Sequence, residues 1–243
     1  MPSNSTTQAG GHLRPALALV AAAAVGACAH SPPPGSAPAL PPADAQQVVR
    51  SLEERTSLSE PIRVVFGWQL NEAGTHLKGR GVARIEPPYK ARLDLFLDNG
   101  ETAVRAALVN GDLRLPAGTR TDVLPPPDLM WGVLGVFRPD TDTRFAGVER
   151  LKSGTLRLRY RYQDGEELDF RVVDGRVHAL ELRDRGGHVA QRVELGLDAS
   201  DRYPLKATYR NLSAFRELKL TRESVERVDS YPPDIWNPKG MER

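Results

Sequence analysis

The chain has 243 residues, with 33 Lys and Arg against 31 Asp and Glu, and a single cysteine. Its formal charge of +2 is too small for a nucleic-acid-binding protein, whose affinity depends on neutralising many phosphates. One cysteine excludes an internal disulfide, a cysteine-rich zinc site and an iron–sulfur cluster, and the five histidines lack metal-ligand spacing. We therefore expect no metal, no cofactor and no nucleic-acid partner.

Residues 1–27 have the pattern of an export signal. A polar start containing Arg14 precedes an apolar stretch over residues 17–27, which is too short to span a bilayer. The run Val25-Gly26-Ala27-Cys28 resembles the bacterial lipobox, in which the cysteine receives diacylglycerol and becomes the acylated amino terminus of the mature protein. This resemblance implies a covalent lipid, with palmitate as a typical acyl chain, at Cys28. An ordinary secretory signal beside an incidental cysteine is the alternative.

Residues 28–43 are predicted to be the lipidated cysteine and a proline-rich tether. Six of the twenty prolines lie between Ala29 and Ala43, and such a composition favours an extended segment without a core. In the lipoprotein sorting of Gram-negative bacteria, Asp directly after the cysteine tends to retain the protein in the inner membrane. Ala29 therefore indicates a lipid anchor in the outer membrane, with the protein facing the periplasm.

Residues 44–230 are predicted to form one domain, which begins with a helix. Ala45, Val48, Val49 and Leu52 follow the i, i+3, i+4, i+7 spacing of an amphipathic helix. Asp44 is the expected N-cap, and the helix is expected to end near Thr56.

Almost everything after this helix has the pattern of strands. The turn dipeptides, which suit two-residue hairpins, are Asn99-Gly100, Asn110-Gly111, Asp164-Gly165 and Asp174-Gly175. Apolar residues alternate with polar ones between these turns, and roughly ten or eleven strands follow one another from Ile62 to Val228. The sequence predicts one large antiparallel sheet, curled because of its size, with an apolar face and an arginine-rich face. Because acids are interspersed, the arginine-rich face is interpreted as a solvated outer face, with a binding patch as the alternative.

A second segment, residues 125–137, is expected to cover the concave apolar face together with the helix. Pro127 and Asp128 suit the start of a short helix, and almost no polar residue follows them. The apolar candidates of this segment are Leu129, Met130, Trp131, Val133, Leu134 and Phe137. The segment is either a plug that completes the core, a movable lid over a lipid-binding cavity, or a loop that inserts into a membrane.

The opening strands carry a resemblance to a known family. Phe66-Gly67-Trp68-Gln69-Leu70, residues 79–85 (Gly-Arg-Gly-Val-Ala-Arg-Ile) and residues 89–95 (Tyr-Lys-Ala-Arg-Leu-Asp-Leu) are similar to strands of the LolA/LolB-like lipoprotein carrier and acceptor family. The resemblance implies a mainly β fold, an incomplete β-barrel with an N-terminal helix and a helical lid around a cavity for acyl chains. Leu93, Leu95 and Tyr160 are then expected to line this cavity beneath the lid residues.

Catalytic motifs are missing from the sequence. There is no Gly-x-Ser-x-Gly elbow, no His-Glu-x-x-His pair and no phosphate-binding loop. Gly79-Arg80-Gly81 lacks a third glycine and lies in a strand pattern, so we interpret it as a bend in a curved sheet. We therefore expect a protein that is not an enzyme.

Two functions of different kinds follow from these patterns. The first is a membrane-anchored periplasmic lipoprotein that binds an acyl chain, another apolar ligand or lipoprotein cargo in a lidded cavity, in lipoprotein or lipid transport. The second is a structural or interaction lipoprotein with a solid core, which docks an envelope partner through its outer face or its C-terminal tail, residues 231–243 with Trp236. The oligomeric state stays open.

Overall fold

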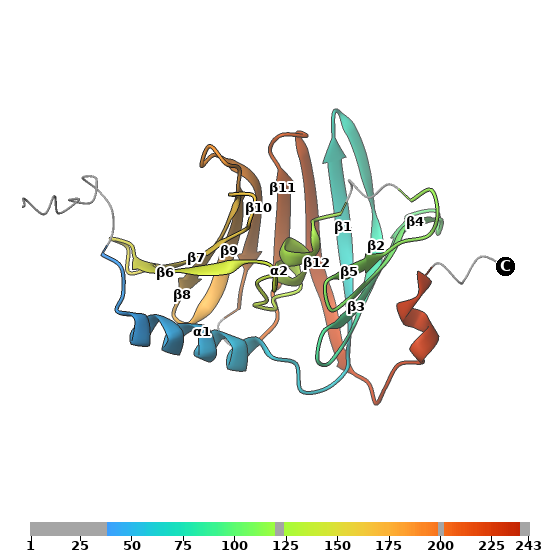
Figure 1. Cartoon of the computed structure of the whole chain (residues 1–243). Helices are drawn as coiled ribbons and strands as arrows, with labels where there is room; N and C mark the ends of the chain where they lie inside the picture. The colour runs from blue at the N-terminus through green and yellow to red at the C-terminus, as the bar shows by residue number, and fades with distance from the viewer. Residues whose placement is uncertain (1–37, 120–123, 199–201, 239–243) are drawn as a thin grey trace, which may run out of the picture. The chain divides into compact units, whose positions relative to one another are not determined.

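The fold is built on one antiparallel sheet of twelve strands that does not close into a barrel (Figure 1). The computed structural model describes residues 38–119, 124–198 and 202–238, so Cys28 and the predicted export signal lie outside the described residues. The strands are β1 (Ile62–Glu72), β2 (Thr75–Glu86), β3 (Lys90–Leu97), β4 (Thr102–Val109), β5 (Asp112–Arg114), β6 (Arg144–Arg150), β7 (Leu156–Arg161), β8 (Glu167–Val173), β9 (Arg176–Arg183), β10 (Val189–Gly196), β11 (Lys206–Asn211) and β12 (Arg216–Arg227). The predicted mainly β fold with one large antiparallel sheet is confirmed.

The strand order is β5-β4-β3-β2-β1-β12-β11-β10-β9-β8-β7-β6. Neighbours along the chain pair antiparallel, except β5 and β6, which are the two ends of the sheet. The four predicted turn dipeptides all lie between paired strands. Asn110 and Asp174 adopt the left-handed φ values, 61° and 51°, that such turns require. The long-range pair of β1 with β12 joins the two halves, with Trp68 opposite Leu220.

The first helix, α1, spans Pro42–Thr56 and begins two residues before the predicted N-cap. Proline occupies the first turn, where its missing N–H removes no hydrogen bond, and Asp44 lies inside that turn. The expectation that Asp44 caps the helix was therefore wrong, because Pro41 holds the cap position without a side-chain hydrogen bond. Ala45 and Leu52 are buried against the core, as their spacing predicted.

The second helix, α2, spans Pro127–Val133 and lies against β9, β10 and β11, inside the curve of the sheet (Figure 1). Every residue from Asp128 to Val133 is buried, so the helix packs on all sides. Gly132 lets it approach β9 closely, because a Cβ at this position would lie 2.6 Å from Leu180 Cδ2. We call residues 125–137 the plug.

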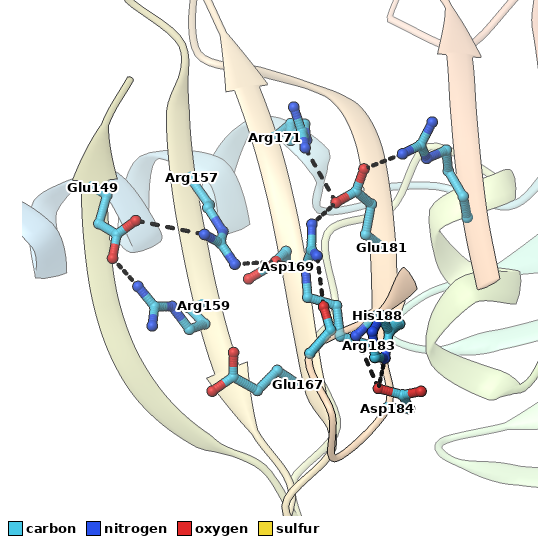
Figure 2. Close-up of polar contacts among 12 residues, drawn as sticks. Glu149, Arg157, Arg159, Glu167, Asp169, Arg171, Glu181, Arg183, Asp184 and His188 are labelled. Carbon is cyan, nitrogen blue, oxygen red and sulfur yellow. Dashed lines mark hydrogen bonds and ion pairs between the residues drawn. The ribbon is translucent and has the colours of Figure 1, made fainter. Parts of the chain in front are cut away.

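The convex face of the sheet carries a ladder of ion pairs (Figure 2). Asp169 of β8 is fully buried and accepts hydrogen bonds from Arg157 (2.6 Å) and Arg183 (2.8 Å) on the flanking strands. Glu181 of β9 is in turn paired with Arg183 and, at 2.7 Å, with Arg192. On strands β7 to β10 the arginines are thus paired with acids on the same or a neighbouring strand, which fits the predicted outer face better than a basic binding patch there.

The C-terminal segment folds back onto the same convex face. The short 3₁₀ helix η2 (Pro233–Trp236) lies over β3 and β4, where Arg92 donates to the carbonyl oxygen of Ile235 (2.7 Å). Trp236 is only 5% exposed and forms an edge contact with Tyr231, with ring centroids 5.7 Å apart. The aromatic residue that was considered for docking a partner is therefore buried against its own sheet.

Candidate functional site

Two aromatic residues of β1, Trp68 and Phe66, pack over glycines of β2, and Trp68 forms the floor of the candidate site. The indole nitrogen of Trp68 donates to the carbonyl oxygens of Arg80 (3.1 Å) and Phe96 (3.0 Å). Glycines make this possible, because a Cβ at Gly79 would lie 1.9 Å from the oxygen of Phe96. A Cβ at Gly81 would likewise lie 2.4 Å from the ring of Phe66. The glycine pair is thus a packing feature of the sheet.

Beside this floor the concave face leaves a hollow of about 720 Å³. Strands β1, β2, β3, β4 and β12 supply its apolar wall, and the loop that follows β5, residues 116–119, faces them. The apolar wall residues among those described are Trp68, Leu70, Leu77, Leu95, Val104 and Leu218. The volume lies within the range of about 300–1,000 Å³ that is typical of small-molecule sites.

Polar residues, among them Glu72, Thr102 and Arg105, also line the hollow. Glu72, at the end of β1, forms an ion pair with Arg216, its register partner on β12. Arg216 is only 4% exposed, so this pair forms a fixed, neutral boundary at one side. Leu77 is 39% exposed and marks the point where the apolar wall meets solvent. An apolar chain could therefore enter at this rim without displacing a buried charge.

The predicted lid residues belong to the plug, which fills the other part of the concave face. Leu129 and Trp131 are at most 1% exposed, and Phe137 stacks edge-on against Phe170 and Tyr160. The spaces that touch Met130, Val133 and Leu134 measure only about 40 and 10 Å³. A contact between any of these side chains and a ligand stays a prediction.

Of the three predicted wall residues, Leu95 lines the large hollow. Leu93 borders the smaller of the two spaces beside the plug, and Tyr160 lies in the aromatic cluster with Phe137. All three are buried, but plug residues pack beside Leu93 and Tyr160, whereas Leu95 lines the large hollow. Their role toward a ligand also stays a prediction.

Several wall residues were not predicted. Trp68, Leu70 and Leu77 alternate along the β1–β2 hairpin, and this alternation together with the two glycines was the signal that could have found them. Leu218 and residues 116–119 carried no such signal, because they reach the hollow through the β1–β12 pairing and through a loop.

A buried carboxyl group anchors the start of the plug. Asp128 is 8% exposed and accepts a hydrogen bond from the hydroxyl of Tyr162, which directly follows β7. Burial raises the pKa of Asp128 from 3.8 to about 6, and the hydrogen bond from Tyr162 opposes this shift. Among the described residues no group of three or more His, Cys, Asp or Glu could hold a metal ion. The carboxyl group therefore acts here as a polar tether for α2.

The overall fold has counterparts among solved structures. A LolA superfamily protein from Nitrosomonas europaea matches with a TM-score of 0.54 and 10% identity, over 79% of this chain and 97% of that chain. A DUF1329 family protein from Desulfovibrio piger matches with a TM-score of 0.56 and 9% identity, over 82% and 98%. A putative outer membrane lipoprotein-sorting protein domain from Vibrio parahaemolyticus gives 0.51 and 9%, over 80% and 97%.

These likenesses confirm the predicted resemblance at the level of the fold, which is LolA-like. No protein-family model matches the sequence, and no curated protein matches it. Across residues 38–119, 124–198 and 202–238, no helix has the length and apolar character needed to cross a bilayer.

Proposed function

We propose that this LolA-like fold serves as a non-catalytic carrier in the cell envelope, which holds an acyl chain or another apolar ligand in the hollow beside the plug. The observation that carries the proposal is the hollow of about 720 Å³ with an apolar wall on the concave face. One structural neighbour is described as a putative outer membrane lipoprotein-sorting protein domain, and this likeness supports a role in lipoprotein or lipid transport.

Burial of apolar surface is the proposed source of affinity. Each methylene group removed from water stabilises the complex by about 0.8 kcal/mol. The wall residues Trp68, Leu95 and Leu218 offer no charged group to an inserted chain. Affinity should therefore rise with the length of the acyl chain until the hollow is full, and the headgroup should stay at the rim near Glu72 and Leu77.

In this proposal the plug is a fixed wall, and the ligand enters from the side of the β1–β2 hairpin. The plug is as buried as the rest of the core, whereas Leu77 at the rim is 39% exposed. The hollow already exists with α2 in place, so loading requires no displacement of Trp131 or Leu129.

The proposal includes an anchor at Cys28, in the outer membrane and facing the periplasm. Several acyl chains on one cysteine would hold the protein at the membrane more firmly than a single chain does. A membrane fractionation of cells that express wild type and Cys28→Ser tests this part separately. We expect the serine variant to move to the soluble fraction, and an equal membrane share for both would reject the anchor.

The binding function is tested by native mass spectrometry of the full chain carrying Cys28→Ser, after incubation with palmitate. Leu77→Glu places a charge at the rim, and Leu212→Glu is the matched control, because Leu212 is similarly exposed (44% against 39%) and lies outside the hollow. We expect palmitate adducts with the parent protein and the control and few with Leu77→Glu. Empty protein in all three samples, or equal loading, would overturn the proposal and favour a solid-core interaction lipoprotein.

A further inference from the structure

Among the described residues, part of the edge of β4 that borders the hollow has no strand partner. Asn110 donates its backbone N–H to the carbonyl oxygen of Tyr89, on the β3 side. Backbone groups alternate along an antiparallel strand, so Leu108, Ala106 and Val104 also face β3. Val109, Ala107 and Arg105 therefore direct their N–H and C=O groups to the opposite side.

Strand β5 occupies only part of that side. Its three residues pair with Val109, Leu108 and Ala107, and then the strand ends. No described residue pairs with the backbone of Arg105 on this side, and residues 102–105 line the hollow. A register shift at Ala103 ends the regular ladder there, so the usable edge is residues 104–106.

At the opposite end of the sheet, the edge strand β6 has a partner. The outer edge of β6 is covered by residues 38–40, where Leu40 donates to the carbonyl oxygen of Val148 (2.8 Å) and Arg150 donates to that of Pro38 (3.2 Å). Open edges invite pairing with another chain, and proteins usually cover them. The edge at β6 is thus covered by the chain itself, whereas no described residue pairs with the backbone of Arg105 at the edge beside the hollow.

We propose that residues 104–106 of β4 accept an extended polypeptide segment as an added strand. Main-chain hydrogen bonds to Arg105 would hold the segment, and alternate side chains would point to opposite faces of the sheet. Side chains on the concave face would meet Val104 and Leu95, which are both apolar wall residues of the hollow. These positions of the segment are therefore apolar.

The position opposite Arg105 takes an acidic side chain. Three guanidinium groups surround one carboxylate on the convex face, since Arg84 (2.5 Å) and Arg92 (2.9 Å) already bind Asp94 and Arg105 lies 3.7 Å away. The buried Nε atom of Arg105 faces Asp94 without forming a hydrogen bond, and Nη2 of Arg105 donates to the hydroxyl of Thr102 (3.3 Å), so no carboxylate on the described residues binds this guanidinium at hydrogen-bond distance. Because opposite charges on paired strands stabilise a sheet, the preferred segment alternates apolar, acidic and apolar residues.

This inference extends the proposed function, because the peptide would lie along the hollow that holds the acyl chain. It does not depend on lipid, so peptide binding is measured on lipid-free protein. Loss of palmitate binding alone would reject the acyl-chain function, and loss of peptide binding alone would reject the added strand.

The probe is a blocked, fluorescein-labelled peptide of alternating valine and glutamate, with a valine–lysine peptide for comparison. Fluorescence anisotropy with the full chain carrying Cys28→Ser should show about fivefold tighter binding of the glutamate peptide. Arg105→Ala should abolish that preference. Arg105→Pro, which also removes the edge N–H, should bind about fivefold more weakly than Arg105→Ala.

A second edge serves as the control. Leu113 faces away from β4 on the outer side of β5, so Leu113→Pro removes an edge N–H outside the proposed contact. This variant should bind the glutamate peptide as wild type does. Hydrogen exchange followed by NMR tests the proposal without a substitution at Arg105. The backbone amide of Arg105 should exchange more slowly with solvent when the peptide saturates the protein. An unchanged Arg105 exchange rate at saturation, no binding, or equal weakening by Leu113→Pro would overturn the proposal.

Discussion

The indole nitrogen of Trp68 on β1 reaches over β2 and donates a hydrogen bond to the carbonyl oxygen of Phe96 on β3, 3.0 Å away. The contact joins three neighbouring strands through one side chain, and it exists only because Gly79 between them has no Cβ. The floor of the hollow is therefore determined jointly by an aromatic residue and the glycine beneath it.

Gly79→Ala should destabilise the protein strongly. The added methyl group would lie 1.9 Å from the carbonyl oxygen of Phe96, and such overpacking typically costs about 1–3 kcal/mol. Gly67→Ala on the adjacent strand is the control, because its nearest neighbour would be 3.7 Å away. Urea unfolding should show a lower midpoint for Gly79→Ala only. Equal midpoints for the two variants would contradict this account of the floor.

Trp131→Ala should cost about 3–5 kcal/mol of unfolding free energy, as expected for a large aromatic residue in a packed core. Trp131 is 1% exposed and contacts Tyr89 edge-on, with ring centroids 6.0 Å apart. Phe215→Ala should cost less than about 0.5 kcal/mol, because Phe215 is 86% exposed. A small effect of Trp131→Ala in the same unfolding assay would indicate a loosely docked lid in place of a plug.

The stability of the protein should carry a pH dependence from Asp128. Its pKa is raised by burial from 3.8 to about 6, so the native state binds this proton more tightly than the unfolded state. The unfolding free energy should therefore fall as the pH rises from about 4 through 6, by at most about 3 kcal/mol. Asp128→Asn stays neutral and should lack this part of the slope.

The measurement compares thermal unfolding of wild type and Asp128→Asn at pH 4.5 and pH 7.5. Other groups titrate equally in both proteins, so the difference between the two slopes isolates Asp128. Parallel slopes would show that Asp128 is not buried in the way that the structure places it.

Asp169→Asn should be strongly destabilising. It removes the carboxylate that Arg157 and Arg183 share on the convex face and leaves buried charge without its partner, at a cost of about 3–5 kcal/mol. Asp164→Asn is the control, because its ion pair with Arg185 is exposed and should be worth at most about 1 kcal/mol. Chemical unfolding at low salt and in 1 M NaCl checks both. The loss at Asp169 should persist in salt, and its disappearance would mean a screened surface pair.

Local patterns in the sequence were enough to predict the strands and their faces. The alternation of Leu93 and Leu95 with charged residues, and turns such as Asn110-Gly111, depend only on neighbouring residues and on the period of a strand. The burial of the plug was also visible, because its residues are apolar on all sides of a helix. The LolA-like fold was predicted from a resemblance, carried by segments such as Phe66-Gly67-Trp68-Gln69-Leu70, and the solved structures confirm it.

The position of the site depended on contacts that no local pattern encodes. Leu95 and Tyr160 have the same alternating pattern, yet one lines the hollow and the other packs against Phe137. Both residues lie on the buried face of their strand, and the local sequence does not indicate whether a distant segment packs over them. Likewise, Trp236 was considered for docking a partner, and only the folded chain shows it buried against its own sheet.

By itself, the sequence determined the strand pattern, the hairpin turns and the amphipathic helix, because each arises from residues close together in the chain. The tertiary structure decided the pairing of β1 with β12, the placement of the plug in one part of the concave face, and the hollow left in the other. It also decided that the pairing of β5 with β4 ends at Ala107, before Arg105. These features depend on contacts between segments that are distant in the chain. Residues with the same local periodicity can differ in such contacts, so periodicity does not predict them.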